Sequence, residues 1–190
     1  MRRLILLITI FCTLIIGGCS QDKDFSIKSK EFTDEQSEML ALTGNRAFKF
    51  ELKNLPKDKK YEIKIVYEVY KDNKKILEEN IIGMGYVPTV EKVEDRNIAI
   101  AIEGNKIRAL SDGLYSNLDI EEDISKLTNY YFEGDRKINI GDEVYLFHAN
   151  DNGHCASMDK LGELSNEELD NLISDNKLNV FIKLVCKEIW

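Results

Sequence analysis

The segment from His148 to Cys155 holds the densest group of potential metal ligands in the chain, with both histidines and one of the four cysteines. Two imidazoles and a thiolate can bind zinc or another borderline metal, and Cys186 would add a fourth ligand if the last strand runs beside this segment. No C-x2–4-C motif accompanies them, and Asn152-Gly153 is a common turn dipeptide. We therefore expect a polar turn and no cofactor, with a metal site formed by His148, His154 and Cys155 as the alternative.

The rest of the chain offers no catalytic motif. It contains neither the G-x-S-x-G of a serine nucleophile nor the G-x-x-x-x-G-K-[ST] loop that holds phosphates. The acidic run at 119–123 could hold a cation, but acids are common at the start of a helix, where they complement its dipole. Cys155 follows His154 directly, and adjacent side chains of an extended chain point apart, which argues against a thiol nucleophile with its base. We expect a protein that is not an enzyme.

Alternating apolar residues predict the strands that would position these groups. Phe48, Phe50 and Leu52 alternate with charged residues, and the same period of two runs through 63–69. Polar residues at 71–75 and 103–106 separate neighbouring apolar runs, as the turns of antiparallel hairpins do. Further strands are expected over 138–147 and 180–189.

Three segments favour short helices. Capping-box patterns begin at Thr33, ahead of apolar residues that end at Gly44, and at Ser165. In residues 119–131, apolar side chains recur at the i, i+4, i+7, i+11 spacing of one helical face. Together the patterns predict a mainly β chain, an antiparallel β-sandwich of immunoglobulin-like architecture with two or three short peripheral helices.

Aromatic residues are the other candidates for recognition. Tyr130, Tyr131 and Phe132 could line a face that binds carbohydrate or peptide, although aromatic residues in sheets more often pack against other strands. Tyr130 is expected to be the more exposed of the two tyrosines, because Tyr131 completes the apolar stripe of the helix predicted over 119–131.

The first nineteen residues differ in composition from the rest. Arg2 and Arg3 precede an uncharged run that ends in Ile16-Gly17-Gly18-Cys19, and this run is shorter than the roughly 20 apolar residues of a transmembrane helix. The ending resembles the lipobox of bacterial lipoproteins. The resemblance implies that residues 1–18 are a signal peptide, that Cys19 is lipidated, and that the protein is held on the extracytoplasmic face of the cell membrane. An uncleaved N-terminal anchor is the alternative.

The domain organisation and the remaining cysteines follow from that resemblance. Polar residues after the lipidated cysteine predict a flexible tether over 19–32, and a single sandwich domain is expected over 33–190. Cys12 would leave with the signal, so Cys155 and Cys186 remain and could form a disulfide outside the cytoplasm. The competing interpretation is a buried Cys186 in the last strand and a free Cys155.

Charge and composition narrow the choice of partner. The signal removes two arginines, which leaves 24 basic against 34 acidic residues and a net charge of −10, a poor match for nucleic acid or anionic lipid headgroups. Abundant lysine, asparagine and isoleucine are typical of AT-rich genomes and suggest a Gram-positive cell surface. We expect a membrane-anchored extracytoplasmic lipoprotein that acts as a non-catalytic binding or interaction module for a protein or a cell-envelope ligand.

Overall fold

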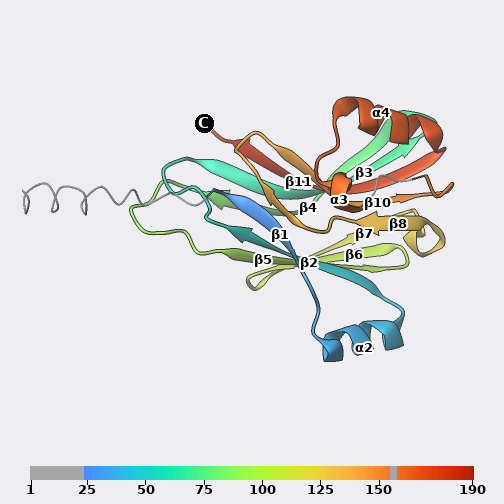
Figure 1. Ribbon diagram of the computed structural model, residues 1–190, viewed down its shortest axis with the longest axis horizontal. Helices are drawn as coiled ribbons and strands as arrows, with labels where there is room; N and C mark the ends of the chain where they lie inside the picture. The colour runs from blue at the N-terminus through green and yellow to red at the C-terminus, as the bar shows by residue number, and fades with distance from the viewer. Residues whose placement is uncertain (1–23, 155–157) are drawn as a thin grey trace, which may run out of the picture.

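The computed structural model describes residues 24–154 and 158–190, and the signal segment, Cys19 and Cys155 lie outside the described residues. Two antiparallel sheets pack face to face, which confirms the expected β-sandwich (Figure 1). Sheet A has the order β7-β6-β5-β2-β1-β9, and sheet B has the order β4-β3-β11-β10-β8. The strands are β1 (Ser26–Lys30), β2 (Arg46–Lys53), β3 (Tyr61–Lys71), β4 (Lys74–Tyr86), β5 (Arg96–Glu103), β6 (Lys106–Ser111), β7 (Leu114–Asp119), β8 (Thr128–Tyr131), β9 (Asp135–Lys137), β10 (Glu143–Asn150) and β11 (Leu178–Glu188).

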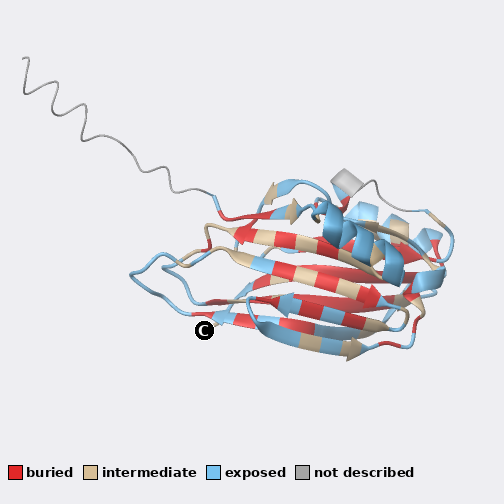
Figure 2. Ribbon diagram, turned by 90° about the horizontal axis from the view of Figure 1, so that it is seen from below, coloured by how far each residue is buried: buried red, intermediate tan, exposed pale blue. Residues whose placement is uncertain are grey.

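The inner faces of the two sheets form one core. In β2 the predicted alternation is confirmed, because Phe48, Phe50 and Leu52 are buried while the residues between them are partly exposed (Figure 2). The outer face of sheet B is also covered, by α3 (Met158–Leu161) and α4 (Asn166–Asp175). A second apolar cluster under these helices includes Phe181 of β11 and Ile173 of α4. β10 and β11 are therefore buried on both faces.

The two predicted hairpins are present. β3 and β4 are joined at Asp72 and Asn73, which adopt φ values of 47° and 64°. Asp and Asn tolerate this left-handed conformation better than other non-glycine residues, and a tight hairpin turn requires it. β5 and β6 are joined through Gly104, whose φ of 59° suits a residue without a side chain. Local turn chemistry thus sets the register of both hairpins.

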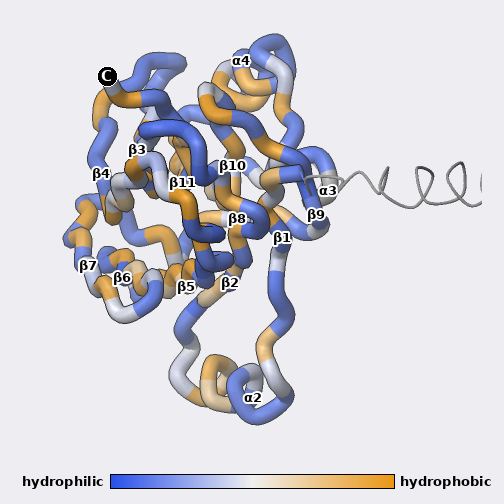
Figure 3. Tube along the Cα trace, turned by 90° about the vertical axis from the view of Figure 1, so that its left-hand side faces the viewer, coloured by the Kyte–Doolittle hydropathy of each residue, from blue (hydrophilic) through white to orange (hydrophobic). Residues whose placement is uncertain are grey.

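Both predicted capping boxes begin helices. Thr33 caps α2 (Asp34–Thr43), Gly44 ends it with a φ of 66°, and Ser165 caps α4. None of the residues of α2 is buried, and Figures 1 and 3 show it standing apart from sheet A at the end of a loop. No helix of the described ranges is long and apolar enough to span a bilayer.

The helix predicted over 119–131 is wrong. β7 continues to Asp119, a short 3-10 turn, η1 (Ile124–Lys126), follows, and β8 pairs with β10. The helix-like spacing has another cause, because Ile120 and Ile124 are buried in the sandwich core from an irregular connection. The acids of this segment therefore do not begin a regular helix.

Two strand boundaries also differ from the prediction. Ser26–Lys30, expected within the tether, is a strand between β2 and β9, and it belongs to the sandwich because Phe25 and Ile27 are buried in the core. The strand predicted over 138–147 begins only at Glu143, because a turn precedes it. Asn139 donates its backbone N–H to Asp142 Oδ2 at 2.8 Å, and this bond holds the turn closed.

Candidate functional site: a groove at the sandwich edge

His148 is a core residue of the structure. It lies in β10 with no exposed surface, its ring stacks on Phe181 with centroids 4.4 Å apart, and its Nε2 is 2.9 Å from Asn179 Oδ1. Burial lowers the pKa of His148 to about 4, although the bond with Asn179 acts in the opposite direction. The ring is therefore neutral at physiological pH and belongs to the packing beneath α4.

The other predicted metal ligands are not brought to His148. His154 is exposed, and its backbone carbonyl accepts hydrogen bonds from Asn150 Nδ2 at 3.0 Å and from Asn176 Nδ2 at 3.3 Å. Cys155 lies outside the described residues. Within residues 24–154 and 158–190, no three His, Cys, Asp or Glu side chains are grouped closely enough to hold a metal ion.

Cys186 is buried in the core at the other end of β10. Its backbone N–H donates to Asp142 O at 3.0 Å, just before β10 begins, whereas His154 lies beyond the other end of that strand, where its carbonyl is bonded to Asn150. Eight residues of β10 separate the two ends, about 23 Å at the rise of a β-strand. The predicted disulfide stays a prediction, since Cys155 lies outside the described residues, and so does the competing interpretation of a free Cys155 and a buried Cys186, although the burial of Cys186 agrees with the latter.

A thiol count would decide between these two interpretations. Burial raises the pKa of Cys186 to about 11, so its thiol is protonated as well as inaccessible near pH 8. In a chain without Cys12 and Cys19, we expect Cys186 to resist a thiol reagent in the native state. After denaturation without reductant, two thiols should react, whereas a bridge would leave none.

The acidic run at 119–123 has structural roles. Glu122 is buried, accepts a hydrogen bond from Tyr67 Oη at 2.9 Å and lies 3.2 Å from Lys71 Nζ. Asp123 accepts the backbone N–H of Ser125 at the start of η1. These contacts join the β7–β8 connection to β3, so the acids are used within the fold.

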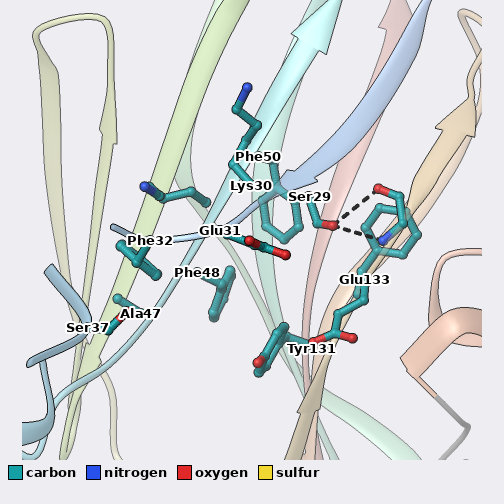
Figure 4. A pocket seen from close by; sticks show the side chains of 13 residues that line it. Ser29, Lys30, Glu31, Phe32, Ser37, Ala47, Phe48, Phe50, Tyr131 and Glu133 are labelled. Carbon is teal, nitrogen blue, oxygen red and sulfur yellow. Dashed lines mark hydrogen bonds between the residues drawn. The ribbon is translucent and has the colours of Figure 1, made fainter. Parts of the chain in front are cut away.

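The structure reveals a groove that the sequence analysis did not predict. β1 pairs with residues 49–53 of β2, and its last pair is Lys30 with Lys49. The first residues of β2, Arg46–Phe48, have no strand beside them on the β1 side among the described residues. The chain instead leaves the sheet toward α2. A groove of about 570 Å³ remains between β2, the start of α2 and β8 (Figure 4). Its lining comprises Ser29, Lys30, Glu31, Phe32, Ser37, Ala47, Phe48, Lys49, Phe50, Tyr131, Phe132, Glu133 and Gly134.

Aromatic rings form the floor of this groove. Phe48 stacks on Phe147 at 5.6 Å and on Tyr131 at 6.3 Å, and Phe50 packs against Phe132 at 6.1 Å between ring centroids. Tyr131 is 39% exposed, whereas Tyr130 is only partly exposed, so the expected order of the two tyrosines is wrong. The reason is that residues 128–131 form a strand and not a helix. Tyr131 is the most exposed of the aromatic residues that line the groove.

Charged side chains border the aromatic floor. Lys30 is paired with Glu51 at 3.0 Å, and Lys49 donates to Gln36 Oε1 while its Nζ lies 4.3 Å from the centroid of the Phe32 ring. Glu31 and Glu133 are exposed and form no ion pair within the described residues, although Glu133 interacts with the hydroxyl of Tyr131. The groove therefore has two carboxylates without a cationic partner among the described residues, whereas its lysines already have partners.

The capping box at Thr33 is a local sequence hint of this groove, although it does not indicate which strand faces it. A helix that begins there requires the chain to leave sheet A just after Lys30, before β2 is fully covered.

Comparison of the chain with protein-family models, with curated proteins and with solved structures finds no match.

Proposed function

We propose that this protein is a lipid-anchored extracytoplasmic lipoprotein that binds an extended segment of another protein in the groove and catalyses nothing. The observation that carries the proposal is the interrupted pairing of β2. Beside Arg46–Phe48 no strand of the described chain pairs with β2 on the β1 side, and β8 is the edge strand of sheet B across the groove. An extended peptide can satisfy such edges by adding main-chain hydrogen bonds, while pockets select its side chains.

The lining of the groove specifies the kind of segment. The aromatic floor around Phe48 and Tyr131 favours an apolar side chain, and Glu31 and Glu133 favour a neighbouring Lys or Arg. Next to it, α2 exposes Met39 and Leu42, which are 59% and 81% exposed. Exposed apolar side chains beside an open groove enlarge the surface that a protein ligand could cover.

Peptide selection tests this function. Random heptapeptides displayed on phage are selected against the mature chain carrying Cys19→Ser, and we expect enrichment of sequences that combine apolar residues with Lys or Arg. Tyr131→Ala should weaken the selected peptides about tenfold because it removes the exposed ring of the floor. Isothermal titration calorimetry measures the change.

Two further variants complete the selection experiment. Tyr115→Ala is the matched control, since Tyr115 is 61% exposed on sheet A and does not line the groove. The double variant Glu31→Lys with Glu133→Lys should reverse the charge preference of the selected peptides. No enrichment, or equal losses in Tyr131→Ala and Tyr115→Ala, would refute the proposed function.

The anchoring half of the proposal has its own test. Because Cys19 alone would carry the lipid, Cys19→Ser should release the protein from the membrane fraction or leave an unprocessed precursor there. Cell fractionation with metabolic labelling by a radioactive fatty acid measures both. A Cys12→Ser variant is the control and should behave as the parent. If Cys19→Ser fractionated, migrated and labelled like the parent, the lipoprotein assignment would be wrong.

A further inference from the structure

We infer that one end of the sandwich rests on the bilayer surface, an inference that depends on the lipid anchoring proposed above. This proximal end is formed by the loop 54–60, the loop 87–95 and residues Ile189 and Trp190. β1 starts at the same end, as the views in Figures 1 and 2 show. The contact is distinct from the groove, which opens where β1 ends.

Hydrogen bonds hold the parts of the proximal end together. The backbone N–H of Thr89 donates to Lys57 O at 2.8 Å, and that of Ile189 donates to Lys60 O at 3.2 Å. Lys60 Nζ also donates to Trp190 O at 3.0 Å. The two loops and the C-terminal residues therefore form one surface, which Figure 3 views end-on.

This surface exposes apolar side chains that nothing in the described chain covers. Trp190 is fully exposed, Val90 is 94% exposed and Val87 is 68% exposed. Tryptophan favours the boundary between headgroups and acyl chains, where its ring is buried and its N–H remains hydrated. Lys57 and Lys59 are exposed beside them, without an ion pair among the described residues, and can reach lipid phosphates.

The short connection to Cys19 favours this contact over others. Asp24 lies at the proximal end, where Asn54 Nδ2 donates to its backbone carbonyl at 3.1 Å. Five residue steps separate Asp24 from Cys19, which corresponds to at most about 18 Å of extended chain. A lipid on Cys19 would therefore hold this end near the headgroups. Because the tether keeps the proximal end at a high effective concentration beside the bilayer, even a weak apolar contact with the lipid would form. The overall charge of the mature chain is negative, so the apolar residues must supply most of the attraction.

The bound orientation would present the groove to ligands. β1 runs from the proximal end to Lys30, a distance of about 13 Å at the rise of a β-strand, and the groove and α2 lie at that far end. With the proximal end on the bilayer, α2 would project sideways from sheet A, partway along the sandwich (Figures 1 and 3). This geometry keeps the groove clear of the lipid surface.

The single tryptophan of the chain is a built-in reporter of this contact. The mature protein with Cys155→Ser is coupled through Cys19 to a maleimide-bearing lipid in phosphatidylcholine vesicles, while Cys186 is protected by burial. We expect Trp190 emission to shift to shorter wavelengths and to be quenched by brominated lipids. The double variant Val87→Asp with Val90→Asp changes only exposed side chains and should abolish both effects.

Coupling at a site away from the proximal end is the control. With Cys19→Ser, Cys155→Ser and Leu42→Cys, the lipid is attached on α2, and Trp190 should emit as it does in solution. An unchanged Trp190 spectrum after coupling at Cys19, or the same shift from both attachment points, would overturn the inference. Because the maleimide lipid replaces native acylation, such a failure leaves the lipidation test on Cys19→Ser unaffected.

Discussion

Replacement of Glu68 by glutamine should destabilise the protein by about 3 kcal/mol, because it breaks a buried ion pair and leaves Lys183 with less compensation. Glu68 lies on the outer face of β3 and has no exposed surface. Its Oε1 is 2.9 Å from Lys183 Nζ and is also paired with Lys75, while its Oε2 accepts a hydrogen bond from Tyr70 Oη at 3.3 Å.

The lysine at the centre of this network depends on both of its carboxylates. Lys183 is 5% exposed and also lies 2.6 Å from Glu143 Oε2. Burial acts to lower the pKa of Lys183, but the bonds with Glu143 and Glu68 outweigh it and raise the pKa above its ordinary value. Glu68 and Glu143 therefore keep the ammonium of Lys183 charged in the interior. Without the Glu68 carboxylate, the free-energy cost of burying this charge is no longer fully offset.

Urea denaturation at neutral pH measures the effect, with Glu78→Gln as the matched control. Glu78 shares Lys75 with Glu68, but its side chain is 54% exposed, so its loss should change the unfolding free energy by less than about 1 kcal/mol. The double variant Glu68→Met with Lys183→Met should recover much of the stability, because it removes both buried charges together. Equal small effects of Glu68→Gln and Glu78→Gln would show that the network does not stabilise the fold.

The fold could be predicted from local patterns because those patterns follow from backbone geometry. The period of two in β2 reports one buried face, and the capping boxes at Thr33 and Ser165 act within a single turn, so both survive in the folded protein. The predicted helix over 119–131 failed because a helix-like spacing needs only buried side chains at the right intervals. Ile120 and Ile124 meet that condition from a loop.

The candidate site could not be predicted because it depends on pairing between distant segments. The groove exists where β1 stops beside Lys49 and where β8, about eighty residues later in the chain, forms the facing edge. For the segment around His148, the sequence suggested a site where the structure has a packed core residue. Its composition suggested a metal site, whereas the burial that makes His148 a packing residue comes from α4 and β11, which follow it in the sequence.

That burial makes His148 a source of acid sensitivity. In the unfolded chain the imidazole takes up a proton as the pH falls through its ordinary pKa of 6.5, whereas in the folded protein it does so only at about 4. Between these values the unfolded state binds more protons, so the stability that His148 provides is complete above pH 6.5 and is lost as the pH falls toward 4. At pH 4 the loss amounts to about 3 kcal/mol.

Stability curves from pH 7 to pH 4 for two variants isolate this contribution. His148→Gln retains an amide donor toward Asn179 but cannot titrate, so its free energy of unfolding should fall by about 3 kcal/mol less than that of the parent over this range. His154→Gln removes the other histidine of the chain, which is exposed, and should retain the acid sensitivity of the parent. Carboxylates titrate equally in all three proteins, so the difference between the curves reports His148 alone. Parallel curves for the parent and His148→Gln would mean that the buried imidazole is not the group whose protonation opposes folding.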